Sequence, residues 1–212
     1  MNRIKSELYV MLGGSFCSFC SETEKEFLTV DHKNDDGYLD RSSNSSFSAK
    51  HIYSRIKSGL DTPNRFQVLC WNCNRSKPPL KKSVARAVGI KKTCLGCGNS
   101  KDESEFHLDG IKRRSRCSTC ISTRRLLKKH SAYQQLGGCC SCCGESRYDR
   151  LALDHIKNDG ADRRRFGEIS IVLYGQVLSG RLRTNIQLLC HNCNASKYYG
   201  RSCIHMRAAV AK

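Results

Sequence analysis

The sequence predicts an α+β protein made of two small cysteine-clamped repeats with a third cysteine-rich segment between them. Two observations support this prediction: the cysteines fall into regularly spaced pairs, and the two ends of the chain resemble each other. Composition is the third, because only 39% of the 212 residues are hydrophobic and 8% are aromatic. Such a polar chain is poorly suited to one large core, so we expect small units held by something besides apolar burial.

Most of the cysteines form C-x-x-C pairs, which predict three structural zinc sites of four thiolates each. Disulfide frameworks have more scattered spacings and belong to secreted chains. The N-terminal stretch MNRIKSELYVMLGG lacks the apolar core of a secretion signal, and no run of about 20 apolar residues follows. We therefore expect a cytoplasmic protein with no membrane partner. The expected zinc ligands are Cys17, Cys20, Cys70, Cys73, Cys94, Cys97, Cys117, Cys120, Cys140, Cys143, Cys190 and Cys193.

Two stretches of about sixty residues carry the same motifs in the same order, as a duplication would leave them. Each has Tyr-x-x-Leu-Gly-Gly, a C-x-x-C pair, and Asp-His eleven positions after the second cysteine. Each ends in a near-identical block, FQVLCWNCNRSK at 66–77 and IQLLCHNCNASK at 186–197. The chain thus divides into a first repeat at 1–80, a basic linker with a zinc ribbon at 81–130, and a second repeat at 131–212.

The repeat also decides between two readings of the run CCSCC at 139–143. Only the pair Cys140/Cys143 keeps the distance to Asp-His that the first repeat shows. Cys139, Cys142 and Cys203 are then left over as candidate packing thiols. Four histidines have no counterpart and receive no role: His51, His107, His130 and His205.

Each repeat is expected to contain the same short elements. A helix that ends at Gly-Gly comes first, and a brief strand at 27–30 or 151–153 leads to Asp-His. The Asn-Asp-Gly that follows predicts a sharp turn. A helix at 47–59 or 167–180, a second strand at 66–69 or 186–189, and a final helix beginning near Asn74 or Asn194 complete the unit.

The segment between the repeats is strongly basic. Residues 92–120 hold two C-x-x-C pairs 19 residues apart, which is typical of a zinc ribbon, and 124–136 predicts a basic amphipathic helix. Between 78 and 130 there are fourteen Lys and Arg against four Asp and Glu. The whole chain has a net charge of +18, which three zinc-thiolate sites would reduce to about +12. This charge favours nucleic acid as the partner, with backbone contacts expected from Lys112-Arg113-Arg114 and Arg163-Arg164-Arg165. We expect that nucleic acid to be double-stranded DNA.

The repeated Asp-His carries candidate chemistry together with the Asn after the last cysteine. In the first repeat these residues are Asp31, His32 and Asn74. Cutting a phosphodiester needs a base to activate water, which imidazole suits, and a hard cation, which carboxylate and amide oxygens can bind. A structural alternative stays open, in which Asp-His caps a turn and Asn caps a helix. The second repeat supplies Asp154, His155 and Asn194.

These motifs resemble a known family. Asp-His followed by C-x-x-C-Asn, with an earlier C-x-x-C, is similar to the HNH or His-Me finger (ββα-metal) endonucleases, closest to the phage recombination endonuclease VII family. The blocks LCWNCN and LCHNCN are its most specific part. The resemblance implies a phage or mobile-element origin and two ββα-metal units with structural zinc at the eight outer cysteines. It implies general bases at His32 and His155, and catalytic Mg²⁺ or Mn²⁺ at Asp31, Asn74, Asp154 and Asn194.

Three functions compete at this point. The leading hypothesis is a metal-dependent DNA endonuclease, monomeric as a one-chain pseudo-dimer, in which each repeat addresses one strand. A non-catalytic, zinc-dependent nucleic-acid-binding protein derived from such units is the alternative. A zinc-ribbon adaptor for a protein partner fits the cysteines but leaves both Asp-His pairs unexplained. Lys77 and Lys197, three residues beyond the Asn, are expected either to contact phosphate or to lie on the surface.

Overall fold

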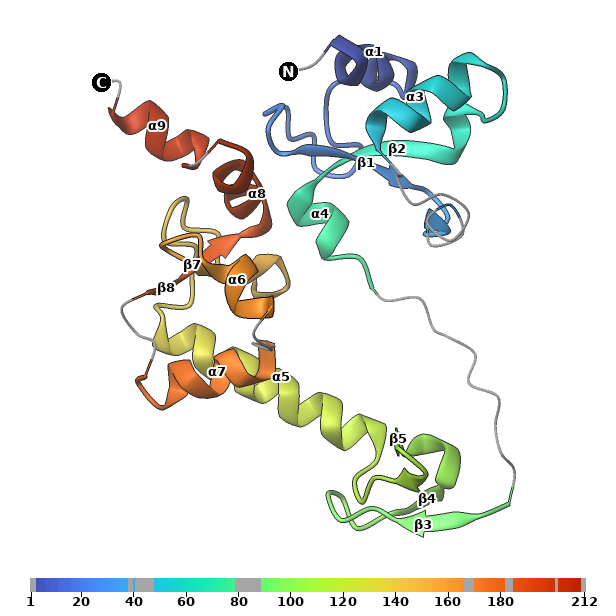
Figure 1. Ribbon diagram of the computed structural model, residues 1–212, viewed down its shortest axis with the longest axis vertical. Coiled ribbons are helices and arrows are strands. Elements are labelled where there is room, and N and C mark those ends of the chain that lie inside the picture. The colour runs from blue at the N-terminus through green and yellow to red at the C-terminus, as the bar shows by residue number, and fades with distance from the viewer. Residues whose placement is uncertain are drawn as a thin grey trace. The chain divides into compact units, whose positions relative to one another are not determined.

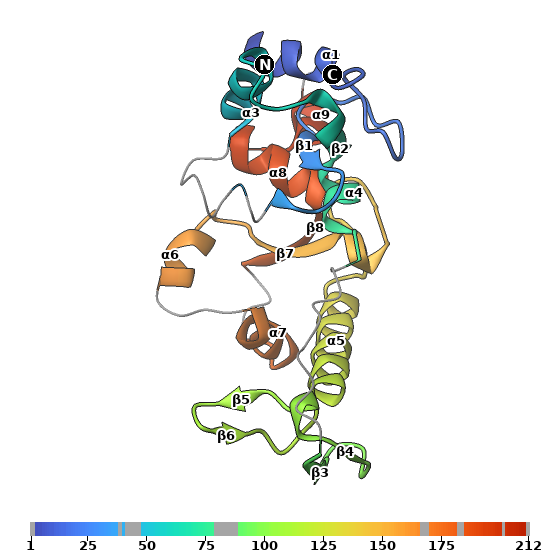
Figure 2. The same ribbon diagram turned by 90° about the vertical axis from the view of Figure 1, so that its right-hand side faces the viewer.

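The computed structural model describes residues 3–37, 40, 48–78, 89–165, 170–181, 185–200 and 202–210 (Figures 1 and 2). These residues form a mixed α+β structure with four two-stranded sheets, which confirms the predicted class. The chain forms two compact units. Unit 1 is Met1–Pro79, Cys139–Asp154 and Gln187–Lys212, and unit 2 is Leu80–Gly138 and His155–Ile186. Within the described ranges, no helix combines the length and apolar character needed to cross a bilayer.

The first repeat is built on an antiparallel pair of strands. Its elements are α1 (Arg3–Met11), β1 (Leu28–His32), α3 (Ala49–Lys57), the 3-10 turn η1 (Pro63–Arg65), β2 (Phe66–Cys70) and α4 (Trp71–Arg75). The two strands pair in a register that sets Asp31 opposite Gln67. The helices α1 and α3 lie side by side, and Leu8, Ile52 and Phe66 are buried between them and the sheet.

The second repeat contains the same core elements. They are η3 (Tyr148–Arg150), β7 (Leu151–His155), α6 (Gly160–Arg165), α7 (Ser170–Leu178), β8 (Ile186–Cys190), α8 (His191–Gly200) and α9 (Ile204–Val210). The strands β7 and β8 pair with each other, as β1 and β2 do. In unit 2, α7 packs against α5 (Ser118–Gln135), as α3 packs against α1 in unit 1. The predicted strands of both repeats are thus confirmed.

The segment between the repeats folds into two short hairpins. They consist of β3 (Lys91–Thr93) with β4 (Ser100–Asp102), and of β5 (Leu108–Asp109) with β6 (Lys112–Arg113), with the 3-10 turn η2 (Glu103–Glu105) between them. Phe106 is fully buried against Cys94 and Cys117 and forms a very small core. The predicted basic helix is confirmed as part of α5, but it begins earlier, directly after Cys117.

Glycines and turn residues stop the elements where the sequence predicts. The helices α1 and α5 both end before Gly-Gly, and Gly13 and Gly137 have φ of 104° and 95°, which glycine adopts without a Cβ clash. After Asp-His, Asp35 and Asn158 have φ of 54° and 59°. Asp and Asn tolerate this left-handed conformation better than most residues, so the predicted sharp turn is confirmed in both repeats.

The final helix of each repeat begins earlier than predicted. The helices α4 and α8 start directly after Cys70 and Cys190, three residues before the Asn. The cysteine sulfur causes this, because each accepts a hydrogen bond from the backbone N–H three residues on, at 3.4 Å in both repeats. Pro78 then keeps α4 short, whereas α8 continues to Gly200.

The two final helices meet in unit 1 through a reciprocal pair of hydrogen bonds. The N–H of Asn72 donates to Oδ1 of Asn192 at 2.8 Å, and the N–H of Asn192 donates to Oδ1 of Asn72 at 3.1 Å. Both residues are buried. When residue i of one partner bonds residue j of the other, and j bonds i in the same way, the contact has two-fold symmetry. The final helices of the two repeats therefore contact each other as the subunits of a symmetric dimer do, within one chain.

Candidate functional site

The twelve paired cysteines come together in the three predicted groups of four. A tetrahedral zinc with Zn–S bonds of about 2.3 Å sets its sulfurs about 3.8 Å apart. Cys20 and Cys70 lie 3.7 Å apart, as do Cys143 and Cys190 in the second repeat. In the ribbon, the sulfurs of Cys94 and Cys120 are 3.8 Å apart. Each group can therefore hold a zinc ion.

The first C-x-x-C of each group forms the same tight turn. The residue after its second cysteine has a left-handed backbone, with φ of 61° at Ser21, 74° at Gly98 and 78° at Gly144. The N–H of that residue donates to the carbonyl of the first cysteine at 2.9, 2.8 and 2.9 Å, respectively. The turn places both cysteine side chains on one side of the chain. Only the first repeat builds it with a residue other than glycine.

Backbone N–H groups near the sulfurs favour the thiolate form that binds zinc. The pKa of Cys94 is lowered to about 6, chiefly because the N–H of Cys117 donates to its sulfur at 3.2 Å. Burial opposes ionisation of Cys17, yet backbone hydrogen bonds from Cys70, Cys20 and Phe19 lower its pKa to about 7. Each of these two groups thus contains one thiol that ionises readily.

Asp31, at the end of β1, is the centre of a polar cluster in the first repeat. Its Oδ2 accepts a hydrogen bond from Nε2 of Gln67 at 2.9 Å, because the strand register sets the two residues opposite each other. Its Oδ1 accepts from Nδ2 of Asn74 at 3.3 Å. The structure therefore brings together the predicted Asp and Asn, and it adds Gln67, which the sequence analysis did not identify.

Lys77 also belongs to this cluster. Its ammonium pairs with Asp31 and lies 2.8 Å from Oδ1 of Asp35. Burial would lower the pKa of Lys77, but its hydrogen bonds to the two carboxylates override this effect and raise the pKa. The sequence analysis weighed a phosphate contact and a surface position for this residue, and it did not identify the pair with Asp31.

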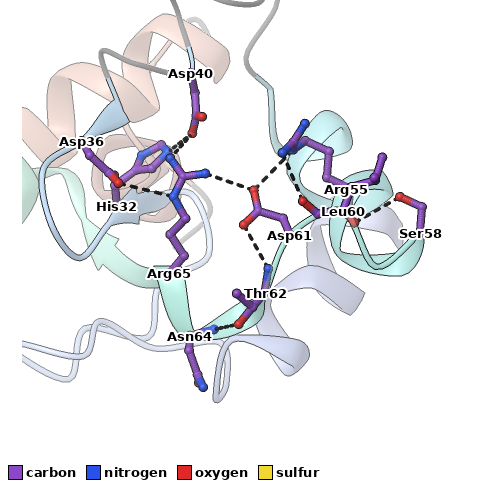
Figure 3. Close-up of polar contacts among 10 residues, drawn as sticks. All are labelled: His32, Asp36, Asp40, Arg55, Ser58, Leu60, Asp61, Thr62, Asn64 and Arg65. Carbon is purple, nitrogen blue, oxygen red and sulfur yellow. Dashed lines mark hydrogen bonds and ion pairs between the residues drawn. The ribbon is translucent and has the colours of Figure 1, made fainter.

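His32, the predicted base, is buried beside this cluster. Its Nε2 lies 2.7 Å from Oδ2 of Asp40 (Figure 3). Its ring meets the ring of Phe66 edge-on, with centroids 5.0 Å apart. The burial of His32 and the short contact to a carboxylate hold the imidazole in one orientation. The sequence analysis did not identify Asp40 as its partner.

Arg65 links that partner to two further carboxylates. Its guanidinium lies 2.8 Å from Asp40, 3.4 Å from Asp36 and 3.1 Å from Asp61 (Figure 3). Burial would raise the pKa of Asp40, but hydrogen bonds from His32 and Arg65 hold it below its usual value. Asp40 therefore stays ionised across the neutral pH range, and the charge beside His32 is permanent there.

In the second repeat, Asp154 has the same neighbours except the Asn. Its Oδ2 accepts from Nε2 of Gln187 at 2.8 Å and from the ammonium of Lys197 at 2.6 Å. Asp154 and Lys197 are each only 9% exposed, so this ion pair is well shielded from water. Within the residues that the structure describes, Asn194 is not among the donors to Asp154. Lys197, like Lys77, pairs with the aspartate.

His155 belongs to unit 2 and has different surroundings from those of His32. It is buried, and Gly160 approaches its ring so closely that an added Cβ would lie 2.6 Å from Nδ1. Asn185 stands where the first repeat has Arg65, and it donates to Asp159 at 3.3 Å. The exposed Asp162 pairs with the exposed Arg165, and Arg163 stands at the position that matches Asp40 in the register of the two repeats.

The sequence contained a signal for some of these residues and none for others. Gln67 and Gln187 recur at the same place in the two closing blocks, so the repeat itself pointed to them. The second repeat has different residues, Arg163 and Asn185, at the positions of Asp40 and Arg65, so a search for repeated residues passes over them. The same holds for three residues that the sequence left without a role and that lie beside Cys193, namely Cys142, Cys203 and His205.

Unit 2 contains a basic cavity of about 760 Å³ between the second hairpin and α5. It includes the predicted run at 112–114, whereas the side chains of Arg163 and Arg164 lie outside the described residues. Asp109 is its one acidic lining residue among those described. The basic lining residues are Lys112, Arg113, Arg114, Arg116, Arg124, Arg125 and Lys128.

Comparisons with protein-family models, with curated proteins and with solved structures found no match for this chain. The resemblance in sequence therefore depends on the motif residues, and their geometry is what supports a function.

Proposed function

We propose that this chain is a metal-dependent endonuclease that hydrolyses phosphodiester bonds in DNA through ββα-metal units. One observation carries the proposal. At the end of β1, the buried His32 is oriented by a carboxylate, and the adjacent Asp31 contacts Asn74, whose Nδ2 lies 3.3 Å from Asp31 Oδ1. A base and a set of hard oxygen ligands at one strand end are the two parts that phosphodiester cleavage needs.

His32 supplies the base in this proposal. With Nε2–H donating to Asp40, the neutral ring carries its lone pair on Nδ1. Nδ1 then accepts a proton from the attacking water, and the ionised Asp40 stabilises the imidazolium that forms. Arg65 keeps Asp40 ionised and fixed, which makes Arg65 a positioning residue.

Asp31 and Asn74 would hold the Mg²⁺ or Mn²⁺, which would neutralise charge on the leaving oxygen when bound. The residues present fit a cation, because the carboxylates of Asp31 and Asp35 already attract one ammonium group and exceed its charge. Lys77 could pair with phosphate instead once a metal ion takes its place. The resemblance assigns the same roles in the second repeat to Asp154, Asn194 and His155.

The basic cavity of unit 2 supports nucleic acid as the substrate. Seven Lys and Arg side chains line it, against one Asp. Such a surface attracts the phosphate backbone without reading sequence, and it predicts binding that weakens steeply as salt rises. A protein partner of the adaptor type would not require this charge.

One observation favours a non-catalytic role for the second repeat. Asp154 is paired with Lys197 in a nearly dry environment, and in the described residues Asn194 does not join it. A metal ion would have to displace a buried ammonium there. In this second candidate function, the first repeat cuts and the second repeat serves to bind DNA.

The test is cleavage of supercoiled plasmid with Mg²⁺, Mn²⁺, Zn²⁺ or EDTA. We expect nicking with Mg²⁺ or Mn²⁺ and none with EDTA, and we expect the His32→Ala/His155→Ala double variant to bind DNA but not to cut it. His107→Ala, which alters an exposed histidine of the ribbon, is the matched control. Unchanged cleavage by the double variant would overturn the assignment of the bases. Salt-sensitive binding without cleavage in any metal would favour the non-catalytic alternative.

A further inference from the structure

Three side chains of the second repeat gather around a sulfur that already belongs to a zinc group. His205 Nδ1 lies 3.8 Å from the sulfur of Cys142, 3.5 Å from that of Cys193 and 3.6 Å from that of Cys203. A tetrahedral zinc with bonds of about 2.3 Å to sulfur and about 2.0–2.1 Å to nitrogen sets nitrogen and sulfur about 3.6 Å apart. All three distances lie close to that value.

Hydrogen bonding does not account for this arrangement. A neutral imidazole nitrogen carries either one proton or one lone pair, so it can form one good hydrogen bond. Here a single nitrogen has three sulfurs at nearly equal distances, all in the range of 3.5–3.8 Å. Three equidistant sulfurs around one nitrogen are the arrangement that a shared central ion produces.

The two groups of the second repeat overlap in one residue only. Cys140, Cys143 and Cys190 complete one tetrahedron with Cys193, and Cys142, Cys203 and His205 complete the other. We propose that the second repeat holds a two-zinc cluster in which the Cys193 thiolate bridges both ions. Each ion then has four ligands, and no position stays open to substrate, so the second zinc is structural.

The second zinc site would stabilise the packing of the C-terminal helix α9 against the first repeat. The helix α9 begins directly after Cys203, and Ile204 packs against the core of the first repeat. The ring of His205 lies 5.3 Å from that of Phe27, and Arg207 pairs with Glu26. All of these residues lie in unit 1. A zinc ion held by His205 would therefore stabilise the contact between the repeats as well as the second repeat itself.

The first repeat provides an internal comparison because it lacks the additional ligands. Phe19, which is 80% exposed, stands where the second repeat has Cys142. Counted from the shared closing block, Ser83 and Ala85 stand where the second repeat has Cys203 and His205. The duplication thus produced two clamps, of which only one acquired ligands for a further ion.

Metal analysis of the purified full chain tests the proposal directly. We expect four zinc ions per chain, one for each group, and three in the Cys203→Ser/His205→Ala variant. Cys139→Ser is the matched control, because Cys139 lies beside the cluster in sequence but belongs to none of the four groups among the described residues. It should leave the zinc content at four.

A second measurement needs no variant and identifies the bridge. With ¹¹³Cd in place of zinc, two ions that share a thiolate give NMR signals that couple to each other, whereas the ions of isolated sites do not. We expect one such coupled pair. Three ions per chain in the unaltered protein, or four ions with no coupled pair, would overturn the two-zinc cluster, whatever the outcome of the cleavage assay.

Discussion

The two histidines that the repeat makes equivalent have very different neighbours. His32 faces the ionised Asp40, and Arg65 ties that carboxylate to Asp36 and Asp61. His155 instead packs closely against Gly160, and the position of Arg65 is taken by the neutral Asn185. Duplication preserved the strand, the turn and the zinc clamp. It did not preserve the charged shell, by which we mean Asp40 and Arg65 beside His32. A shared motif therefore does not by itself make two sites equivalent.

The largest expected effect is on DNA cleavage and rests on the proposed function. His32→Ala should lower the nicking rate by about 10²–10⁴-fold, the usual contribution of a general base. His155→Ala should lower it by less than about tenfold, because the neutral Asn185 stands in the place of Arg65 and Lys197 already pairs with the buried Asp154. Initial rates of plasmid nicking with Mg²⁺ measure both, with the exposed His107→Ala as control. Equal losses from the two variants would show that Asp40 does not distinguish the repeats.

The next effect is on the free energy of unfolding, and here the second repeat should be the more sensitive of the two. Lys197→Met should cost about 3 kcal/mol, because it leaves the carboxylate of Asp154 buried without its ammonium partner. Lys77→Met should cost only about 1 kcal/mol, since the side chain of Lys77 is 24% exposed and water can reach its partners. Urea unfolding of zinc-loaded protein measures both values.

Lys157→Met, at an exposed lysine of the second repeat, serves as the control for these two variants. It should leave the free energy of unfolding within about 0.5 kcal/mol of the parent. If Lys197→Met were as mild as this control, the pair with Asp154 would not be a buried one in solution.

Much of the fold could be predicted from the sequence because its determinants are local or repeated. The Gly-Gly stops, the left-handed Asp35 and Asn158, and the short strands before Asp-His all follow from residue types in a fixed order. The cysteine groups followed from spacing alone, and the structure assembles all three as expected. The start of α4 was wrong because the Cys70 sulfur caps the helix, a role that helix signals do not assign to cysteine.

The rest of the candidate site depends on contacts between distant segments that occur once. His32 contacts Asp40, which Arg65 from just before β2 holds in turn, and the matching positions of the second repeat have neither residue. Cys142, Cys203 and His205 likewise have no counterpart in the first repeat. Only tertiary structure brings such residues together, so neither spacing nor repetition could reveal them. Lys77 and Lys197 did repeat, but their charge suggested phosphate or solvent before it suggested an aspartate.

Asp40→Asn tests the charged shell through its pH dependence. The pKa of Asp40 is lowered in the folded protein, so its ionised form stabilises the fold. This contribution is fully present above the unfolded-state pKa of about 3.9 and is lost as pH falls through the lower folded-state value. Asp40→Asn should therefore cost about 1–2 kcal/mol at neutral pH and progressively less below about pH 4.

Unfolding in urea at several pH values measures that difference. Asp162→Asn is the control, because Asp162 also follows the Asp-His of its repeat but is exposed and pairs with an exposed Arg165. It should change stability little at any pH. A cost for Asp40→Asn that stays constant down to pH values well below 4 would mean that the carboxylate charge of Asp40 is not what stabilises this part of the first repeat.

The smallest expected effect is on stability and comes from the C-x-x-C turns of the two repeats, at Ser21 and Gly144. Ser21 adopts a φ of 61°, where Gly144 of the second repeat has 78°, and a side chain in this conformation costs about 1 kcal/mol. Glycine removes that strain but loses more freedom on folding, so Ser21→Gly should raise the free energy of unfolding by about 0.5 kcal/mol. Gly144→Ser should lower it by a similar amount. Urea unfolding at saturating zinc measures both changes. If Ser21→Gly instead weakened the fold, the exposed Ser21 side chain would have to contribute a contact that outweighs the strain of its backbone.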